Sequence, residues 1–278
     1  MKIIFAGCGS AFTTEEYFQS NAIVQAPSGK RLLIDCGGDI RFALGRLGLG
    51  SKDIDAVFIS HLHQDHIGGM EYLALTKFFT RKPDAPRPIL FCVPELMEPL
   101  WECLRGGLET LETKVMNITD YFDCQPVPIN SSFIWEEVRF TPVQTVHIMS
   151  GYKIMNSYGL MIKHCQPSVP PTRCKVIPFG ADIQTQGRVA FFTTDTQFCP
   201  NQINKFYDLA DIVFHDCETT PFRSSVHAHY DDLKTLRDDV KKKMWLYHYA
   251  PSPKQDPKAD GFRGLVTRGQ EFEIEERL

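Results

Sequence analysis

Four side chains that can bind a metal ion occur within six positions near residue 60. The stretch VFISHLHQDHIGG covers residues 57–69 and places His61, His63, Asp65 and His66 directly after an apolar run. Neutral imidazole and carboxylate groups are ligands for Zn²⁺ and similar divalent metals. A lone histidine is more often a core or surface residue, but this density of ligand types favours a metal site.

The spacing of these side chains divides them into two pairs. In an extended chain, side chains two positions apart point the same way, so His61 and His63 can reach one ion together. Asp65 and His66 follow where the chain turns into the next helix, and they can face a second position nearby. The glycines at 68–69 allow the tight backbone that such a turn needs.

Short β-rich runs, several followed by glycine, must position this motif in the first half of the chain. We expect strands within the segments 2–10, 21–29, 31–38, 55–61 and 88–94. Amphipathic spacing predicts helices over 39–49, 70–80 and 95–111.

The strand signal restarts in the second half. Segment 132–147 alternates apolar and polar residues and predicts an antiparallel pair of strands. Further strands are expected over 157–165, 188–195, 211–218 and 243–250, with helices over 200–209 and 230–242. Segment 166–187 is rich in Pro, Thr and Gln and predicts a loop or an irregular hairpin. Two such halves without a linker predict one α/β domain over residues 1–278, built from two similar layers.

Composition limits the classes of function. With 278 residues, 43% of them hydrophobic, the chain can bury a sizeable core. A net charge of −4 argues against a protein whose affinity comes mainly from nucleic-acid phosphates. Nine cysteines without a CxxC pair, and no signal-like start, indicate free thiols in a reducing cytoplasm. No apolar run approaches the roughly 20 residues that span a bilayer.

HLHQDH resembles the HxHxDH signature of the metallo-β-lactamase superfamily. Other family positions can be matched one by one between residues 2 and about 251. They are His147 in TPVQTVH, Asp195 in FFTTDT, His248 in MWLYHYAP, and Asp35 in LLIDCG, which resembles the aspartate that supports the metal loop. The resemblance implies a four-layer αββα fold, in which two mixed β-sheets are sandwiched between helices.

The resemblance also implies two divalent metal ions, Zn²⁺ or Mn²⁺. Its first site consists of His61, His63 and His147, its second of Asp65, His66 and His248, and Asp195 bridges them. Such a pair lowers the pKa of a bound water and can clamp the attacking and leaving oxygens of a phosphodiester. Lactamases often have a cysteine in place of Asp195. An aspartate suits phosphodiesterases, ribonuclease Z, lactonases and glyoxalases better.

Two later segments resemble ribonuclease Z and its relatives. HDCETT (215–220) and SSVHAHYDDLKTL (224–236) match the region where a histidine assists the leaving oxygen. His227, which fits the spacing to His248 best, or His229 would then act as general acid, a role worth roughly 10²–10⁴-fold. Asp216 could orient it, and Asp65 completes the expected catalytic set. In the alternative interpretation, HAH caps the following helix and Asp216 caps a loop.

The interval between His147 and Asp195 is too short for the basic arm with which ribonuclease Z grips transfer RNA. It contains only five basic residues: Lys153, Lys163, Arg173, Lys175 and Arg188. Relatives without the arm include phosphodiesterases that open cyclic nucleotides, among them phage enzymes that destroy host immune signals, and cyclic-phosphate hydrolases. The resemblance therefore favours a small phosphodiester, with a cyclic nucleotide first.

Aromatic side chains near the expected mouth could stack on a nucleobase. The candidates are Phe12, Tyr17, Phe18, Tyr152 and Tyr158, although packing in a core or loop explains each equally well. A homodimer is expected from the resemblance, because members of this branch often complete a site with the neighbour's loop.

Three alternatives stay open. Cleavage of RNA would need a basic patch assembled from Arg223 and the lysines at 241–243. Hydrolysis of a lactone or carboxylic ester uses the same metal pair without the HAH segment. The third alternative is a metal-stabilised binding or sensor module that holds a nucleotide without turnover. The intact ligand set argues against it, because a pure binder has no need for an open dinuclear centre.

Overall fold

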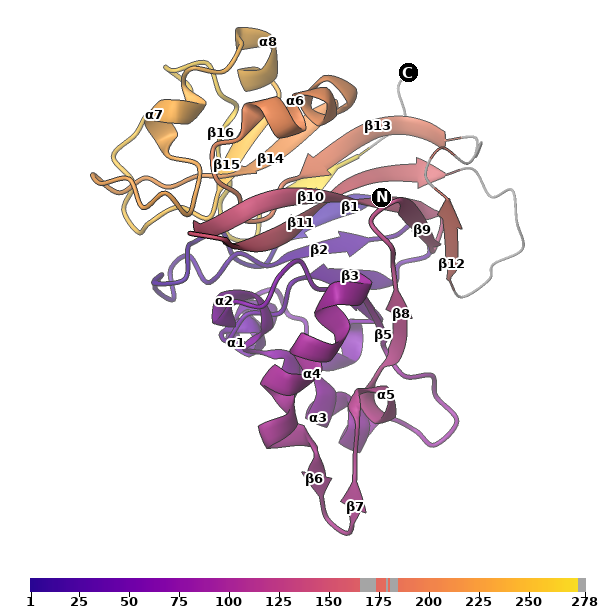
Figure 1. Cartoon of the computed structure of the whole chain (residues 1–278). Coiled ribbons are helices and arrows are strands. Elements are labelled where there is room, and N and C mark those ends of the chain that lie inside the picture. Colours follow the sequence, from indigo (N-terminus) through magenta and orange to yellow (C-terminus); the bar gives the residue numbers. More distant parts are fainter. Residues whose placement is uncertain (166–173, 179, 181–184, 275–278) are drawn as a thin grey trace.

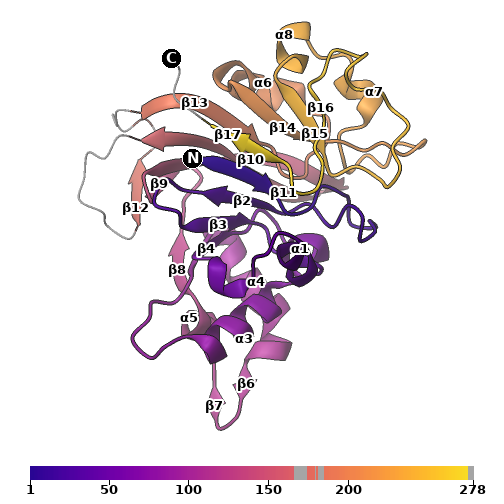
Figure 2. The same ribbon diagram turned by 180° about the vertical axis from the view of Figure 1, so that it is seen from behind.

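Two β-sheets packed against each other form the centre of the molecule, and helices cover their outer faces (Figures 1 and 2). The computed structural model describes residues 1–165, 174–178, 180 and 185–274. Within these residues the layers run helix, sheet, sheet, helix, which is the αββα order expected from the sequence.

The first sheet has seven described strands in the order β17-β1-β2-β3-β4-β5-β8. It is mixed, because β17, β1, β2 and β3 pair antiparallel whereas β3, β4, β5 and β8 pair parallel. The bounds are β1 Lys2–Phe5, β2 Ala22–Gln25, β3 Arg31–Ile34, β4 Ala56–Phe58, β5 Ile89–Cys92, β8 Asp123–Pro126 and β17 Glu271–Glu273.

The second sheet has eight described strands in the order β12-β9-β10-β11-β13-β14-β15-β16. Its first part is antiparallel, and β13 to β16 pair parallel. The bounds are β9 Ser131–Trp135, β10 Val138–Ser150, β11 Lys153–Cys165, β12 Lys175–Pro178, β13 Thr185–Phe192, β14 Ile212–Asp216, β15 Met244–Tyr247 and β16 Gly264–Leu265. The expected antiparallel pair over 132–147 is confirmed as β9 and β10, which turn at residues 136–137.

Helices cover each sheet on the side away from its partner. On the first sheet they are α1 Ile40–Arg46, the 3₁₀ turn η1 Ser51–Asp53, α2 Gln64–Ile67, α3 Met70–Thr80, α4 Pro94–Leu108 and α5 Ile118–Tyr121. On the second sheet they are α6 Pro200–Leu209, α7 Tyr230–Leu233 and α8 Asp238–Lys241. A small hairpin, β6 Thr110–Leu111 with β7 Lys114–Val115, projects beyond α4 (Figure 1).

An aromatic core holds the two sheets together. Phe91 lies 4.1 Å from Phe133, ring centroid to centroid, and Phe133 lies 4.8 Å from Phe140. Phe5 from β1 reaches across to Phe214 of the second sheet at 5.1 Å. Burial of these rings removes a large apolar area from water and fixes the sheets relative to each other. The loops that leave the sheets are thereby held at fixed positions.

Several predicted elements differ from the observed ones. Helices over 70–80 and 200–209 are confirmed, but the single helix over 230–242 is wrong. The chain becomes extended at Arg237, with φ −55° and ψ 145°, between α7 and α8. Arg237 forms ion pairs with Asp208 of α6 and with Asp239, and these contacts accompany the break.

The remaining differences concern strand limits. β1 ends at Phe5 and β2 begins at Ala22, so residues 6–21 form a long connection, called the β1–β2 loop below. The predicted loop or hairpin over 166–187 contains β12 and the start of β13; residues 166–173, 179 and 181–184, Arg173 among them, lie outside the described chain. Among the described residues, no helix has the length and apolarity to cross a bilayer.

Candidate metal centre

The proposed ligands come from strand ends, helix α2 and strand β10 at neighbouring edges of the two sheets. His61 follows β4, Asp195 follows β13, and His248 follows β15 directly. β13, β14 and β15 are parallel, so their carboxyl ends lie at one edge of the second sheet. Long-range strand pairing thus brings together residues that are far apart in the sequence.

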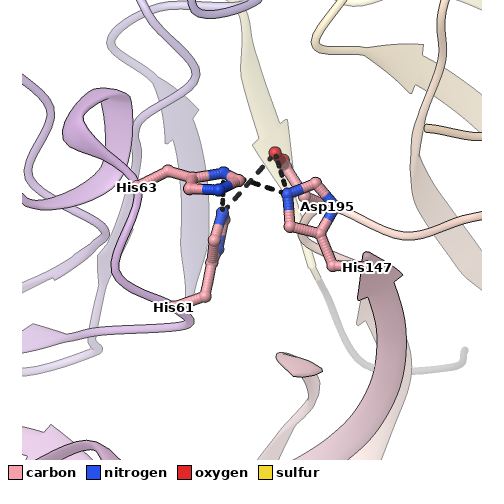
Figure 3. Close-up of side chains that lie close together, drawn as sticks. All are labelled: His61, His63, His147 and Asp195. Carbon is pink, nitrogen blue, oxygen red and sulfur yellow. Dashed lines mark hydrogen bonds and ion pairs between the residues drawn. The ribbon is translucent and has the colours of Figure 1, made fainter. Parts of the chain in front are cut away.

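The first cluster combines three histidines with one carboxylate (Figure 3). His63 Nδ1 lies 3.2 Å from His61 Nε2 and 3.0 Å from His147 Nε2. Asp195 Oδ2 lies 3.7 Å from His61 Nε2 and from His147 Nε2. Ligands about 2.0–2.1 Å from a tetrahedral Zn²⁺ lie about 3.3 Å from one another. The four atoms therefore have the spacing of ligands around one ion.

The second cluster shares the same Asp195 oxygen. Asp65 Oδ2 lies 3.2 Å from His66 Nε2 and 3.2 Å from His248 Nε2. Asp195 Oδ2 lies 3.2 Å from His66 Nε2 and 3.5 Å from His248 Nε2. One carboxylate oxygen thus belongs to both clusters.

Unpartnered buried atoms show that these residues fit metal ions. Asp195 Oδ1 is buried without a hydrogen-bond partner among the described residues, and the buried His66 Nε2 faces two carboxylate oxygens at 3.2 Å. Buried polar groups are normally paired, and an unpaired one is costly. A set of five histidines and two aspartates is typical of a dinuclear metal site, and it does not by itself identify the metal.

Most ligand histidines are held through the nitrogen that faces away from the cluster. Such contacts fix the ring orientation and are a normal part of metal sites. His66 Nδ1 contacts Asp35 Oδ2 at 2.8 Å, His61 Nδ1 contacts Ser60 Oγ at 3.0 Å, His147 Nδ1 donates to Val226 O at 3.1 Å, and His248 Nδ1 lies 3.4 Å from Asp216 Oδ1.

Asp35 supports the HLHQDH loop in the way that the resemblance implied. It has φ +63°, a left-handed conformation that Asp tolerates better than most residues. Its Oδ1 accepts from Ser60 N at 2.8 Å, and its Oδ2 accepts from Ser60 Oγ at 2.8 Å. One buried carboxylate therefore holds both the start of the loop and the ring of His66.

The sequence placed His147 at the end of a predicted strand. In the structure it lies inside β10, which continues to Ser150. The pairing of β10 with β11 skips it, because Val146 pairs with Asn156 and Ile148 pairs with Met155. Such a β-bulge redirects a side chain out of the regular alternation. The bulge accompanies the turn of His147 toward the cluster.

Electrostatics prepare the first cluster for metal binding. Burial is the largest cause of the lowered pKa of His61, His63 and His147, and it brings that of His147 to about 4. Their imidazoles are therefore neutral near pH 7, the form that binds metal. Burial also opposes charge on His66 and His248, but Asp195 and further carboxylates outweigh it and raise the pKa of both. A metal in the second cluster would have to displace protons there.

The two general-acid candidates occupy different places. His227 Nδ1 lies 2.8 Å from Asp216 Oδ2, and its ring centroid lies 4.7 Å from that of His248. His229 instead caps α7, since its Nδ1 accepts from Asp231 N at 3.2 Å and its Nε2 donates to Thr220 O at 3.0 Å. The capping interpretation therefore describes His229, and the geometry brings only His227 to the clusters.

Asp216 contacts both His248 of the second cluster and His227. Besides its contact with His227, its Oδ2 accepts from Thr196 N at 2.9 Å. Burial lowers the pKa of His227, but Asp216 and Asp195 outweigh it, so the pKa is raised overall. Both carboxylates therefore favour the charged form of this imidazole.

The aromatic candidates divide into packed and exposed rings. Phe18 and Tyr158 are buried, and Tyr17 packs edge-on against Tyr249. Phe12 and Tyr152 are fully or almost fully exposed. The sequence reasoning missed the exposed Phe222, whose position five residues before His227 was the available signal.

In the basic patch suggested for RNA, Arg223, Lys241 and Lys243 are engaged within the chain. Arg223 pairs with Asp232, and Lys241 pairs with Asp238 at 3.0 Å. Lys243 Nζ donates to Ala210 O at 2.8 Å. These contacts reduce the charge available to phosphates and weigh against the RNA alternative.

Comparisons with known proteins agree with this geometry. The family model described as "Anti-Pycsar protein Apyc1" matches residues 1–272. An anti-Pycsar protein Apyc1 from Paenibacillus harenae is 31% identical, over 99% of this chain and 100% of that protein. The metallo-β-lactamase fold protein YhfI from Bacillus subtilis has a TM-score of 0.67 at 16% identity, covering 98% of both chains. A diphosphatase from the PhnP family has a TM-score of 0.71 at 19% identity, covering 100% of this chain and 99% of its own. The predicted metallo-β-lactamase fold is confirmed.

Proposed function

Because this chain belongs to the family of the anti-Pycsar protein Apyc1, we propose that it is a two-metal phosphodiesterase that opens small cyclic nucleotides. The observation that carries the proposal is the single Asp195 oxygen shared by two ligand clusters, with the His227 and Asp216 pair beside them. The resemblance to phosphodiesterases without an RNA-binding arm supports the same class of substrate.

The metal ions would be Zn²⁺ or Mn²⁺, held by the seven residues of the two clusters. When bound, such a pair supplies Lewis acidity toward water and toward the oxygens of a phosphodiester. Asp195 would be a ligand at both positions. Asp65, held between the rings of His66 and His248, contributes the carboxylate of the second position.

His227 supplies the proton that the reaction requires. Asp216 occupies its Nδ1, so Nε2 is the nitrogen that remains to donate toward a leaving oxygen. Opening of a cyclic phosphodiester breaks one ring P–O bond, adds the oxygen of water to phosphorus, and places a proton on the departing sugar oxygen. The product is a nucleoside monophosphate.

Exposed rings offer surfaces for the base. Phe12, Tyr152 and Phe222 each leave a large part of the ring open to solvent. They belong to the β1–β2 loop, which accepts a hydrogen bond from His248 N through Cys8 O, to the turn that follows His147-bearing β10, and to the loop before His227. Stacking on aromatic rings binds bases with little sequence preference. We propose that one or more of these rings contact the nucleobase.

A homodimer in the cytoplasm completes the proposed setting. The tip of the hairpin formed by β10 and β11 exposes apolar side chains at Met149, Tyr152, Ile154 and Met155. Exposed apolar side chains that gather in one patch often mark a site of interaction with another protein. All nine cysteines are free, which suits a reducing compartment.

A substrate panel tests the proposal. Purified protein loaded with Zn²⁺ or Mn²⁺ would be assayed on 3′,5′- and 2′,3′-cyclic mononucleotides, bis-nitrophenyl phosphate, a lactone and a precursor transfer RNA. We expect metal-dependent opening of cyclic mononucleotides that His63→Ala abolishes, with the RNA intact. Turnover of RNA or lactone alone would overturn the substrate assignment, and full activity in His63→Ala would overturn the metal assignment.

A further inference from the structure

The ring of His61 faces two serine hydroxyls on the side away from the metal centre. Its Nε2 points into the first cluster (Figure 3), whereas its Nδ1 lies 3.0 Å from Ser60 Oγ and 3.4 Å from Ser157 Oγ. All three side chains are fully buried, and burial lowers the pKa of His61, so the ring carries a single proton near pH 7. A hydroxyl can either donate or accept. The nitrogen that carries the ring proton therefore depends on where the two serine protons point.

The hydroxyl proton of Ser60 is directed to Asp35. Ser60 Oγ lies 2.8 Å from Asp35 Oδ2, and a carboxylate oxygen can only accept. The same oxygen faces His66 Nδ1 at 2.8 Å. Because Ser60 has one proton and gives it to Asp35, its oxygen presents a lone pair to His61 Nδ1.

The hydroxyl proton of Ser157 is directed to Thr194. Thr194 Oγ1 lies 2.6 Å from Thr193 O, and a carbonyl oxygen can only accept, so Thr194 supplies the proton of that contact. Thr194 Oγ1 also lies 2.7 Å from Ser157 Oγ. Two oxygens at this distance have a proton between them, and here it comes from Ser157. Ser157 therefore also presents a lone pair to His61 Nδ1.

The turn that contains Thr194 is strained and firmly held. Thr194 has φ +54°, a left-handed conformation that a β-branched residue rarely adopts. Strained backbone of this kind occurs preferentially at functional sites. Thr194 directly precedes Asp195, and Thr145 Oγ1 lies 3.1 Å from Ser157 O and 3.3 Å from Asp195 O. The hydroxyls of Ser157 and Thr194 are thus fixed beside the carboxylate that both clusters share.

We propose that Ser157 and Thr194 are positioning residues of the first metal site. Together with Ser60 they hold His61 in the tautomer whose proton is on Nδ1. Nδ1 then donates to the serine oxygens, and Nε2 keeps its lone pair for a metal ion. In the other tautomer an Nε2–H group would point into the cluster and oppose a cation. The inference rests on the proposed metal assignment and is independent of the proposed substrate.

Removal of the Thr194 hydroxyl tests the proposal, because it leaves the Ser157 proton free to turn toward His61 Nδ1. Thr194→Val keeps the β-branched shape, and Ser157→Ala added to it removes that proton as well. Zn²⁺ affinity is measured by competition with a chromophoric chelator, and the first site is identified as the one that His63→Ala removes. Long-range ¹H–¹⁵N NMR spectra of the metal-free protein show which nitrogen of His61 carries the proton, with His61→Gln to assign the signals.

A second buried pair of hydroxyls provides the matched control. Ser132 Oγ of β9 lies 2.7 Å from Thr141 Oγ1 of β10, the same distance as in the Ser157 and Thr194 pair. Thr141→Val, alone and with Ser132→Ala, removes the same chemical groups from another place in the second sheet. Circular dichroism of each variant checks that it is folded.

We expect the parent to show the proton of His61 on Nδ1. Thr194→Val should weaken Zn²⁺ binding at the first site about tenfold or more, because a misdirected buried hydrogen bond costs about that factor, and should reveal the Nε2–H form. The double variant with Ser157→Ala should bind more tightly than Thr194→Val alone, and both control variants should bind like the parent.

Three results would overturn the proposal: an Nε2–H form of His61 in the parent, unchanged Zn²⁺ binding by Thr194→Val, or a double variant that binds no more tightly than Thr194→Val. Failure of the metal assignment would be seen separately. The parent and His63→Ala would then bind Zn²⁺ alike, and the NMR spectra would still decide the position of the ring proton.

Discussion

At the scale of single residues, Asp195 and Asp216 organise the centre. Asp195 joins the two clusters through one oxygen, and Asp216 contacts both His248 and His227. The HLHQDH side chains could be proposed as ligands from the sequence because they are local and follow the alternation of an extended chain. His227 and His229 could not be separated in that way. Their spacing of two positions does not show which of them faces the metal centre. In the structure His227 contacts Asp216, whereas His229 caps α7.

Replacement of His227 should affect substrates according to their leaving groups. In His227→Ala we expect turnover of a cyclic nucleotide to fall about 10²–10⁴-fold, because an alkoxide needs a proton to depart. Nitrophenyl esters should lose far less, since nitrophenolate leaves without one. Parallel steady-state kinetics on both substrates measure the difference, with His229→Ala as the neighbouring control. Equal losses on the two substrates would count against the general-acid role.

The protonation state of His227 should set the alkaline limit of activity. Its folded-state pKa is raised, with Asp216 the largest cause that favours the charged form, so the donor is lost only as pH rises through that raised value. Asp216→Asn should therefore shift the alkaline limb of the kcat profile to lower pH. Metal content is measured in the same samples, because Asp216 also contacts His248. An unshifted limb at unchanged metal content would contradict the assignment.

At the scale of elements, strand pairing and the short segments that follow the strands bring the proposed ligands together. Periodic segments such as 70–80 and 200–209 were predictable because an apolar face and a following break define each helix. The break at Arg237 and the pairing of β12 with β9 depend on partners distant in the sequence, and no local signal encodes them. The same holds for His147, whose bulge exists only in the register of β10 with β11.

The connection after β3 offers a test of how the metal loop is held. Asp35→Asn keeps a residue that tolerates φ +63° but replaces one acceptor oxygen with a donor. We expect the free energy of unfolding to fall by about 1–3 kcal/mol, because a buried contact to Ser60 or His66 is lost. Metal affinity should fall about 10–100-fold. Urea unfolding and metal titration measure the two effects, with Asp84→Asn at an exposed loop position as control. Unchanged affinity would show that Asp35 does not support the site.

At the scale of the whole molecule, the metal clusters join the two halves of the αββα fold. His61, His63, Asp65 and His66 follow a strand of the first sheet, whereas the other ligands belong to the second. Composition and periodicity predicted two similar layers, but the packing of sheet on sheet came from the resemblance. Periodicity alone does not predict which strands of the two sheets pack against each other.

Metal binding across this junction should stabilise the folded chain. At a free metal concentration of 100 times the Kd, each site adds about 2.7 kcal/mol to the free energy of unfolding. Scanning calorimetry with and without Zn²⁺ or Mn²⁺ should show a higher Tm for the loaded protein. The increase should be smaller in His63→Ala and intact in His164→Ala, a histidine on β11 outside both clusters. The same increase in His63→Ala as in the parent would place the metal elsewhere.

The most direct test of the central claim follows turnover of a 3′,5′-cyclic mononucleotide while metal is added stepwise to metal-free protein. Bound metal per chain is measured on the same samples. Asp195 places one oxygen in both clusters, so we predict that the rate rises until two ions are bound per chain. The Asp195→Asn variant should never reach the maximum rate of the parent protein. Full turnover with one ion, or turnover in chelator, would contradict a two-metal phosphodiesterase.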